Sequence, residues 1–461
     1  MPRRALLTKG LRGHGVSAQS KGPRSVTDGC TSFAGVVSSE LPDGWQLRRL
    51  GELVERPQYG LTASATGEPR GPRFLRITDI QESGVAWRTV PYCECDADSG
   101  GRLRLRPGDV VIARIGATTG KAYLIRDEVD AVFASYLIRL RATDRLVPEF
   151  LAFFTNSAPY WRQIDSVKGG RLKQGINIPL LQSLEIPLPP LPEQRAIAEV
   201  LRTVQRAKEA TEKVIAATRQ LKASLMKHLF TYGPVPVDQV DQVTLKEMKI
   251  GAAPTHWETV RLGEKATIGN GSTRKRTDPR YWEGGLTPWL TSGKIHEGVI
   301  RHADEYVTEV ARDECHLPLI PRGSLVVAIT GQGKTLGNSA KLELDACVSQ
   351  HLAYVSIREA DLSPDFTLAF LRSRYDWLQA ISRAGGSTKG ALTCGLLKSL
   401  EIPKPPISEQ RQIATHLSAV DAKLAAEESR RAALEVLFKS LLHHLMTGRL
   451  RVKDIGVQHE A

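Results

Sequence analysis

The chain contains one long helix pattern that occurs twice. The first copy runs from Ser183 to Tyr232, and the second begins at Ser399, 216 residues later. Each copy opens with a proline-rich lead-in, SLEIPLPP or SLEIPKPP, and proline is excluded from helix interiors and central strands. An uninterrupted helical pattern of about 38 residues follows in each copy, which corresponds to a rod ~57 Å long. Any fold for this chain must therefore accommodate two long helices.

Each helix pattern carries one narrow apolar seam. A narrow seam sustained over this length is typical of a helix that packs along another helix in a coiled coil. Because the copies match in lead-in, length and phase, we expect each helix to be the partner of the other; two unrelated surface helices are the alternative. The seam residues are Ile197, Leu201, Val204, Thr211, Ile215, Thr218, Leu225 and Leu229 in the first copy, and Ile413, Leu417, Val420, Leu424, Leu434, Phe438, Leu441 and Leu445 in the second.

The repeat extends far beyond the helices. Trp45 matches Trp257, and each is followed by a Leu-Gly-Glu triplet. The strand-like run PGDVVIA at 107–113 matches PRGSLVVA at 321–328, and Pro148 matches Pro364 at the start of a short helix pattern. The offset between the copies drifts from 212 to 216 residues, so the copies differ by small insertions. Loop insertions are where two copies of one scaffold diverge in what they bind.

The repeat predicts a chain of α+β class in which mixed domains alternate with long helices. Residues 1–40 are basic and rich in Gly and Ser, so we expect a disordered extension; an upstream start codon is the alternative. The remaining predicted segments are a first domain at 41–190, a first helical region at 191–232, a linker at 233–252, a second domain at 253–406, a second helical region at 407–450 and a tail at 451–461.

The charge balance indicates a polyanionic partner. The 461 residues carry a formal net charge of +13, which favours nucleic acid, with a merely solvated basic surface as the alternative. The sequence has no apolar run long enough to span a bilayer, so no membrane association is expected. Six cysteines without a C-x-x-C pair are typical of reduced thiols and predict a cytoplasmic protein with no metal site.

Two glycine-lysine loops lie at matching places, at 114–121 (RIGATTGK) and 329–335 (ITGQGKT). Neither has the spacing of a nucleotide-binding P-loop, and we interpret both as turns that contact DNA phosphates. Other cationic loops recur at matching positions, although most charge runs are simply solvated. The candidate DNA-binding residues are Arg114, Lys121, Lys168, Arg171, Lys173, Arg274, Lys275, Arg276, Lys334, Thr335 and Lys389.

The sequence contains no recognisable catalytic motif. The tetrapeptides LPPL at 188–191 and KPPI at 404–407 lack the polar residue that an amino-methyltransferase needs before its two prolines. A metal-dependent nuclease needs carboxylates arranged on a metal, and Glu247-Met248-Lys249 lies in the predicted linker without them. We therefore expect a protein with no catalytic residue, no metal ligand and no cofactor of its own.

With the repeat, the proline lead-ins and the two Glu-Gln-Arg helix starts, the sequence resembles the specificity subunit of type I restriction-modification enzymes. The resemblance covers about residues 41–450 and rests on the motif order LPDGW/APTHW, GDVVIAR/GSLVVAI, the two glycine-lysine loops and SLEIP to EQR, each occurring twice. It implies two target recognition domains and an antiparallel coiled coil of the two helices that acts as a ruler between them. The N-terminal extension is not explained by the resemblance.

The resemblance also implies partners. Each domain would read one half of a bipartite double-stranded DNA site, and the chain would bind two adenine-N6 methyltransferase subunits that use S-adenosylmethionine, with motor-nuclease subunits that use ATP and Mg²⁺. A free-standing or architectural DNA-binding protein is the alternative, and an enzyme that binds nucleotide at the glycine-lysine loops is a third. The residues implied for the helical spacer and partner docking are Glu193, Gln194, Arg195, Ile197, Leu201, Glu409, Gln410, Arg411, Ile413 and Leu417.

Overall fold

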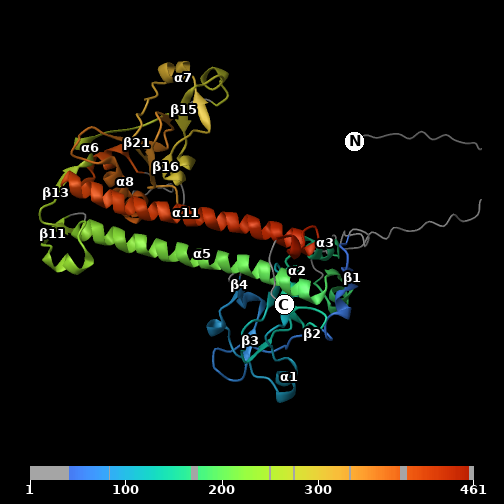
Figure 1. Cartoon of the computed structure of the whole chain (residues 1–461). Helices are drawn as coiled ribbons and strands as arrows, with labels where there is room; N and C mark the ends of the chain where they lie inside the picture. Colours follow the sequence, from blue (N-terminus) through green and yellow to red (C-terminus); the bar gives the residue numbers. More distant parts are fainter. Residues whose placement is uncertain are drawn as a thin grey trace, which may run out of the picture. The chain divides into compact units, whose positions relative to one another are not determined.

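The computed structural model describes residues 41–81, 84–167, 175–248, 251–273, 276–331, 334–384 and 392–455. The chain divides into two compact units, Met1–Gln205 with Leu437–Ala461 and Arg206–Val436 (Figure 1). Two long helices, α5 (Leu191–Tyr232) and α11 (Ile407–Met446), each have one end in one unit and the other end in the other. The predicted N-terminal extension, 1–40, lies outside the described residues.

The first unit is a mixed α/β domain. Its sheets are ordered β2-β9-β6-β7, β1-β10, β3-β8 and β4-β5. Its strands are β1 (Gln46–Arg49), β2 (Gln58–Tyr59), β3 (Arg73–Leu75), β4 (Ile80–Gln81), β5 (Gly84–Val85), β6 (Val110–Ala113), β7 (Ala122–Leu124), β8 (Ala131–Phe133), β9 (Leu137–Leu140) and β10 (Glu185–Leu188). Its short helices are α1 (Ala97–Arg102), α2 (Pro148–Phe154), α3 (Ala158–Val167) and α4 (Ile178–Ser183).

The second unit repeats this plan with additional strands. Its sheets are ordered β14-β21-β18-β19-β16, β17-β15-β20, β13-β22 and β11-β12. Its strands are β11 (Leu245–Met248), β12 (Gly251–Pro254), β13 (Glu258–Arg261), β14 (Ala266–Asn270), β15 (Thr287–Leu290), β16 (Val299–Ile300), β17 (Glu305–Val307), β18 (Leu325–Ala328), β19 (Ser339–Leu342), β20 (Cys347–Val348), β21 (Leu352–Ile357) and β22 (Glu401–Lys404). Its short helices are α6 (Leu262–Lys265), α7 (Glu309–Glu314), α8 (Pro364–Ser373), α9 (Tyr375–Ala384) and α10 (Cys394–Ser399).

The central sheets of the two units have the same register. Val110 of β6 pairs with Leu140 of β9, and Leu325 of β18 pairs with Val355 of β21. Successive residues of β6 point to opposite faces: Val110 and Ile112 belong to the core cluster that α2 covers, whereas Val111 and Ala113 belong to a second cluster on the other face. The central strands are therefore buried on both faces, which explains their continuous apolar runs.

The long helices pack beside each other in each unit. In the second unit, ion pairs join Lys208 to Glu435, Arg219 to Glu428 (2.6 Å) and Lys222 to Asp421 (2.5 Å). Residue numbers rise on α5 as they fall on α11, so the helices are antiparallel. In the first unit, Ile197 and Leu201 of α5 share a core cluster with Leu442 and Leu445 of α11. The predicted fold, two mixed α/β domains with two long antiparallel helices, is confirmed.

The segment that the sequence indicates as a linker contains regular structure. A 3-10 helix, η5 (Val237–Gln242), precedes the antiparallel hairpin β11–β12, in which Leu245 pairs with Pro254 and Met248 with Gly251. Gly251 has φ +104° at the end of this hairpin, a conformation that glycine adopts without a Cβ clash. Short polar and glycine-rich runs fit a hairpin as well as a linker, which is why the pattern alone does not distinguish them.

Candidate nucleic-acid interface

The start of each long helix is hydrogen-bonded to the tryptophan near the start of its own domain, Trp45 or Trp257. Trp45 donates its indole N–H to Glu193 Oε2 at 3.0 Å, and Trp257 donates to Glu409 Oε2 at 2.8 Å. Glu193 also accepts two hydrogen bonds from Arg451, whereas Glu409 pairs with His256. The glutamates of the Glu-Gln-Arg motif therefore face their own domain.

The glutamines of the motif bridge the helix start to the domain as well. Val147 N–H donates to Gln194 Oε1 at 2.8 Å, and Ser363 N–H donates to Gln410 Oε1 at 2.8 Å. The amide nitrogens donate to main-chain carbonyls, those of Arg145 and Pro189 in the first unit and those of Asp361 and Pro405 in the second. Both glutamines are buried, at 1% and 0% exposure, so the motif fixes the angle at which each helix leaves its domain.

The remaining residues predicted for docking divide into exposed and buried sets. Arg195 and Arg411 are exposed beside the buried glutamines. Ile197, Leu201, Ile413 and Leu417 lie in the core clusters of their units, with exposures of 0 to 4%. Along this first turn of each helix, the arginines are thus the part of the motif that a partner can reach.

Each helix also ends beside a tryptophan near the start of a domain, α5 beside Trp257 and α11 beside Trp45. Gly233 follows α5 with φ +84°, and a Cβ there would lie 3.5 Å from the Trp257 ring. Gly448 follows α11 with φ +71°, and a Cβ there would lie 3.7 Å from the Trp45 ring. A left-handed glycine is a common helix terminator. Both helices are consequently fixed at both ends by the same residue types.

The glycine-lysine loops join equivalent strands, β6 to β7 and β18 to β19. Gly120 and Gly337, both with positive φ, donate their N–H groups to the carbonyls of Ala113 and Ala328. This match aligns Lys121 with Asn338 rather than with Lys334. The second loop is two residues longer, and Lys334 lies inside it. Both lysines are exposed.

A tyrosine from a later helix, α3 or α9, hydrogen-bonds to the main chain of each loop. Tyr160 of α3 donates its hydroxyl to Gly120 O at 2.8 Å, and Tyr375 of α9 donates to Lys334 O at 2.8 Å. Burial raises the pKa of the Tyr160 hydroxyl, which keeps it protonated and able to donate. The loops are therefore held by main-chain contacts that leave their lysine side chains exposed.

Three segments distant in the sequence meet where the central strands end. Arg114 N–H donates to Tyr136 O at 3.0 Å, and Ile176 N–H donates to Arg114 O at 2.8 Å. The second unit has the same pair of bonds, from Ile329 to His351 at 3.0 Å and from Leu392 to Ile329 at 2.8 Å. We call these places the first edge (Tyr59, Arg114, Ser135, Tyr136 and Ile176) and the second edge (Asn270, Ile329, Thr330, Gln350, His351 and Leu392).

The first edge presents a stacked arginine. The Arg114 guanidinium carbon lies 4.6 Å from the Tyr59 ring centroid, and Nη1 lies 3.5 Å from Ser135 O. Tyr59 is itself held by a hydrogen bond of 3.2 Å from Ile178 N–H to its hydroxyl. Tyr136 is 55% exposed beside them. An aromatic face and a cation are thus presented together at the end of the sheet.

The second edge presents neutral polar side chains instead. Gln350 Nε2 lies 3.2 Å from His351 Nε2, and His351 Nδ1 lies 2.5 Å from Thr330 Oγ1. Asn270 occupies the position of Tyr59, since Tyr59 pairs with Ile138 and Asn270 with the matching Ala353. Gln350, His351 and Asn270 are exposed. The two edges share their main-chain bonds and differ in their side chains.

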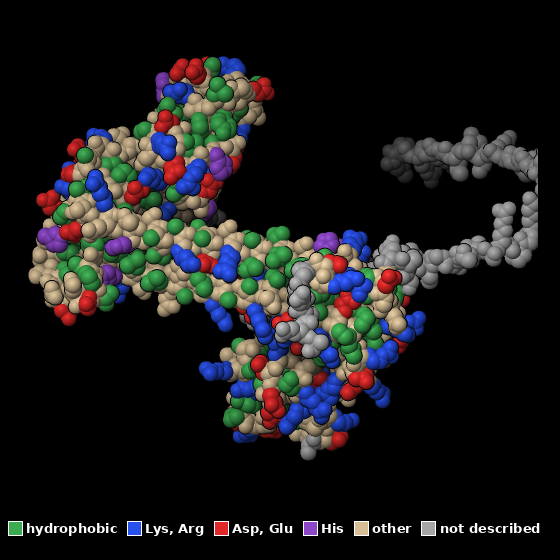
Figure 2. All heavy atoms as spheres, viewed as in Figure 1, with side chains coloured by type: hydrophobic (Ala, Val, Ile, Leu, Met, Phe, Trp, Pro, Cys, Tyr) green, Lys and Arg blue, Asp and Glu red, His purple; other side chains and the backbone are tan. Residues whose placement is uncertain are grey.

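The other cationic candidates contribute less to these edges. Lys168, Arg171, Lys173, Arg274, Lys275 and Lys389 lie outside the described residues. Arg276 forms a bidentate pair with Glu305, and its guanidinium lies 5.4 Å from the Trp282 and Trp289 rings. Thr335 Oγ1 contacts His296 Nε2 at 3.1 Å. On the face drawn in Figure 2, Lys and Arg side chains lie among Asp and Glu side chains over both units.

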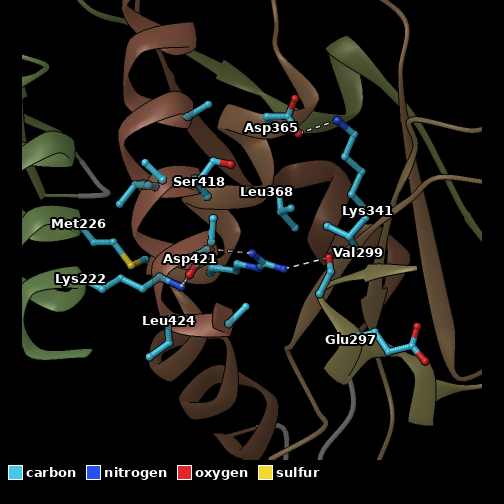
Figure 3. Close-up of a pocket in the computed structure, with 18 of the residues that line it drawn as sticks. Lys222, Met226, Glu297, Val299, Lys341, Asp365, Leu368, Ser418, Asp421 and Leu424 are labelled. Carbon is cyan, nitrogen blue, oxygen red and sulfur yellow. Dashed lines mark hydrogen bonds and ion pairs between the residues drawn. The ribbon is translucent and has the colours of Figure 1, made fainter. Parts of the chain in front are cut away.

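A groove of about 1550 Å³ lies inside the second unit, lined by α11, α8, β16, β19 and the end of α5 (Figure 3). Several of its charges are paired with one another: Lys222 and Arg372 both contact Asp421, and Lys341 contacts Asp365 at 2.6 Å. Arg372 also donates to Gly298 O at 3.0 Å. Lys222, Arg372 and Lys341 already have anionic partners and are therefore less suited to bind DNA phosphate than the exposed loop residue Lys334, which also lines this groove.

The described residues also lack a membrane-spanning helix and a metal-binding cluster. No helix among them is both long enough and apolar enough to cross a membrane. No group of three or more His, Cys, Asp or Glu side chains in this part of the chain is arranged to hold a metal ion.

Comparison with known proteins identifies relatives along most of the chain. A family model described as the type I restriction modification DNA specificity domain matches residues 42–218 and 254–436. The MjaX type I restriction enzyme specificity subunit of Methanocaldococcus jannaschii is 25% identical over 435 residues, 92% of this chain and 97% of that one. The MjaVIII specificity subunit of the same organism is 20% identical over 430 residues, with the same coverage.

A solved structure supports the fold. The crystal structure of a type I restriction-modification system S subunit from M. genitalium matches 88% of this chain and 96% of its own length, with a TM-score of 0.59 and 18% identity. The two stretches matched by the family model correspond to the two copies of the repeat.

Proposed function

This chain belongs to the type I restriction modification DNA specificity family, and from this premise we propose that each domain reads one half of a bipartite, asymmetric DNA site. The recognition domains would be residues 41–190 and 253–406. The observation that carries the proposal is the pair of edges, which share main-chain hydrogen bonds at Arg114 and Ile329 but present different side chains. Two domains of one scaffold can read two different half-sites if they present different side chains to the DNA.

The proposal assigns DNA contacts to two kinds of residue. Exposed cations of the loops, Lys121 and Lys334 among the described residues and Lys168, Arg171, Lys173, Arg274, Lys275 and Lys389 outside them, would bind phosphates and set the register. Phosphate contacts carry no sequence information by themselves. Arg276 is a weaker candidate because Glu305 already neutralises it.

The long helices would act as the spacer between the readers. The contacts of Trp45 and Trp257 with both ends of the helices support this role, because a helix fixed at both ends transmits its length. Inserting four residues at matching heights in α5 and α11 adds ~6 Å, nearly two base pairs at ~3.4 Å each. We expect the spacer of the recognised motif to change accordingly; an unchanged spacer would contradict the ruler.

The partners follow from the same proposal. The chain would recruit two adenine-N6 methyltransferase subunits that use S-adenosylmethionine, and motor-nuclease subunits that use ATP and Mg²⁺ would join for restriction. Exposed Arg195 and Arg411 at the helix starts are the residues of the Glu-Gln-Arg motif that such subunits can contact. The complex would act on DNA in the cytoplasm.

A genome-wide map of adenine methylation, measured with and without this gene, tests the proposal. We expect one bipartite motif to lose methylation when the gene is deleted and to regain it when the gene is restored. If every motif stays methylated while the partner methyltransferase is expressed, the chain does not direct modification. DNA binding without co-purification of a methyltransferase would instead favour a free-standing DNA-binding protein.

A further inference from the structure

We propose that Arg114 on the first edge and Gln350 on the second edge are base-reading residues, with Arg114 selecting guanine and Gln350 selecting adenine. The proposal rests on the function proposed above, in which each domain reads DNA, and it names the side chains that discriminate between bases. Arg114 is the first residue of the glycine-lysine loop at 114–121, seven residues before its lysine, and Gln350 belongs to neither loop.

Arg114 and Gln350 lie where the two edges share main-chain hydrogen bonds but differ in their side chains. Arg114 and Ile329 make the same two main-chain hydrogen bonds, and Tyr136 and His351 supply the same acceptor. Ser135 therefore corresponds to Gln350, and Arg114 to Ile329. Arg114 and Ile329 thus differ in side chain although their main-chain hydrogen bonds match, and so do Ser135 and Gln350 beside the matching acceptors. Residues that read two different half-sites from one scaffold are expected to differ in this way.

Arg114 is held in a geometry that suits guanine. Its guanidinium stacks at 4.6 Å on the Tyr59 ring, and its Nε is buried with no hydrogen-bond partner among the described residues. The guanidinium is planar by delocalisation, and stacking on the ring restrains its orientation, which reduces the entropy lost on binding, while the terminal nitrogens remain able to donate. Two parallel N–H donors match the O6 and N7 acceptors of guanine in the major groove.

Gln350 is oriented by a relay through His351. If Gln350 donates one amide N–H to His351 Nε2 (3.2 Å), the imidazole carries its proton on Nδ1 and donates it to Thr330 Oγ1 (2.5 Å). The carbonyl oxygen and the second N–H of Gln350 then form an adjacent acceptor and donor. This pair matches the N6 donor and N7 acceptor of adenine, whereas guanine offers two acceptors there.

A phosphate contact would give a different result from base reading. Losing a phosphate contact weakens binding to all sequences alike, whereas losing a base contact relaxes one position of the motif. Arg114→Lys separates the two cases, because lysine keeps the charge but lacks the bidentate fork. It should therefore relax the motif while leaving the salt dependence of binding nearly unchanged.

The experiment is adenine-methylation sequencing of cells that express the full complex with wild-type chain, Arg114→Ala, Arg114→Lys or Gln350→Ala. We expect each Arg114 variant to lose about ten- to a hundredfold discrimination at one guanine position in one half-site, and Gln350→Ala to lose as much at one adenine position in the other, in line with a bidentate base contact. The unaffected half-site reports that the complex is folded and active. Arg88→Ala and Gln239→Ala, at exposed residues of η4 (Trp87–Thr89) and η5, are matched controls that should leave the motif intact.

Three outcomes overturn the inference. The motif can stay unchanged in all three variants, both halves can relax together, or the affected base can be other than the one assigned. If Arg114→Ala methylates no DNA at all, Arg114→Lys decides, since an unchanged motif with that variant assigns Arg114 to phosphate. A wild-type complex that methylates without any sequence preference would refute the proposed function itself, and that result is distinct from the other three.

Discussion

The central sheets of the two domains have the same strand register but differ in a buried pair of polar side chains beside it. In the first domain Asp109, at 1% exposure, accepts hydrogen bonds of 2.7 and 2.9 Å from Arg141. At the matching positions of the second domain, Ser324 and Ser356 place their hydroxyls 2.8 Å apart. An ion pair beside β6 and β9 in the first domain thus corresponds to a pair of hydroxyls beside β18 and β21 in the second.

This difference shows which features define the scaffold. The main-chain pairing, the Trp–Glu contacts and the buried glutamines occur in both copies, whereas the polar pair has been exchanged. Burying charges costs desolvation that a neutral pair avoids. Arg139 illustrates that cost: burial lowers the pKa of its guanidinium, and it bonds to the carbonyls of Arg102 and Arg104.

Removing the buried carboxylate should produce the largest difference between the domains. Asp109→Ala leaves Arg141 and Arg139 without their buried partner, and we expect a loss of about 3–5 kcal/mol, as for other broken buried pairs. Ser324→Ala removes one neutral hydrogen bond and should cost about 1 kcal/mol. Hydrogen exchange measured by mass spectrometry on peptides that contain β6 and β18 separates the two domains.

The paired design gives this prediction its own control. Each variant should accelerate exchange in its own domain, and the Asp109→Ala effect should be much the larger. Equal losses in the two domains would mean that the ion pair is worth no more than the two hydroxyls, and that water replaces the carboxylate at Arg141.

Removing either bridging glutamine should produce a smaller and equal effect. Gln194→Ala and Gln410→Ala each leave one N–H group and two carbonyls unpaired in a buried place, and each should cost about 2–3 kcal/mol. Chemical unfolding monitored by hydrogen exchange provides the measurement. Exposed Gln220 on α5 is the matched control, and Gln220→Ala should change stability by less than about 0.5 kcal/mol.

Unequal losses at the two glutamines would undermine the common scaffold. The distances are nearly the same in both units, so a difference above about 1 kcal/mol would mean that neighbouring contacts contribute differently to the two junctions. In that case the two copies would be alike in sequence and backbone structure but would differ in how much these contacts contribute to the free energy of unfolding.

Much of the fold can be predicted from the sequence because it depends on local, repeated signals. Proline lead-ins and a sustained apolar seam indicate both long helices, and matched strand runs indicate two copies of one domain. The opening tryptophans and the Glu-Gln-Arg starts are also visible, although their mutual hydrogen bonds are not, because about 148 residues separate Trp45 from Glu193.

The edges could not be predicted because three distant segments build each one. Tyr59, Tyr136, Asn270, Gln350 and His351 belong to no motif, and the sequence singles out Arg114 only as the first residue of a glycine-lysine loop. The sequence also does not show that Lys121 aligns with Asn338, because the second loop is two residues longer and the positive φ shared by Gly120 and Gly337 is not visible in the sequence. The within-chain comparison of hydrogen bonds supplies the missing signal.

The smallest expected difference in stability concerns the residue that contacts the glutamate of each Trp–Glu pair, which is Arg451 in the first unit and His256 in the second. Arg451 binds Glu193 through two hydrogen bonds, of 2.8 and 2.6 Å, whereas His256 makes one contact of 2.9 Å with Glu409 and is 54% exposed in its side chain. A bidentate arginine–carboxylate pair is stronger than an exposed single contact. Arg451→Ala should cost about 1–2 kcal/mol, and His256→Ala less than about 0.5 kcal/mol.

The melting temperatures of both variants, measured in low and high salt, test this prediction, since neither substitution removes a Trp–Glu hydrogen bond. We expect the melting temperature of Arg451→Ala to fall clearly below that of His256→Ala at either salt concentration, because the Arg451 pair is partly buried and only weakly screened. If His256→Ala destabilises the protein as much as Arg451→Ala does, the histidine holds Glu409 in place for Trp257. The two junctions would then be equivalent in energy even though one uses an arginine and the other a histidine.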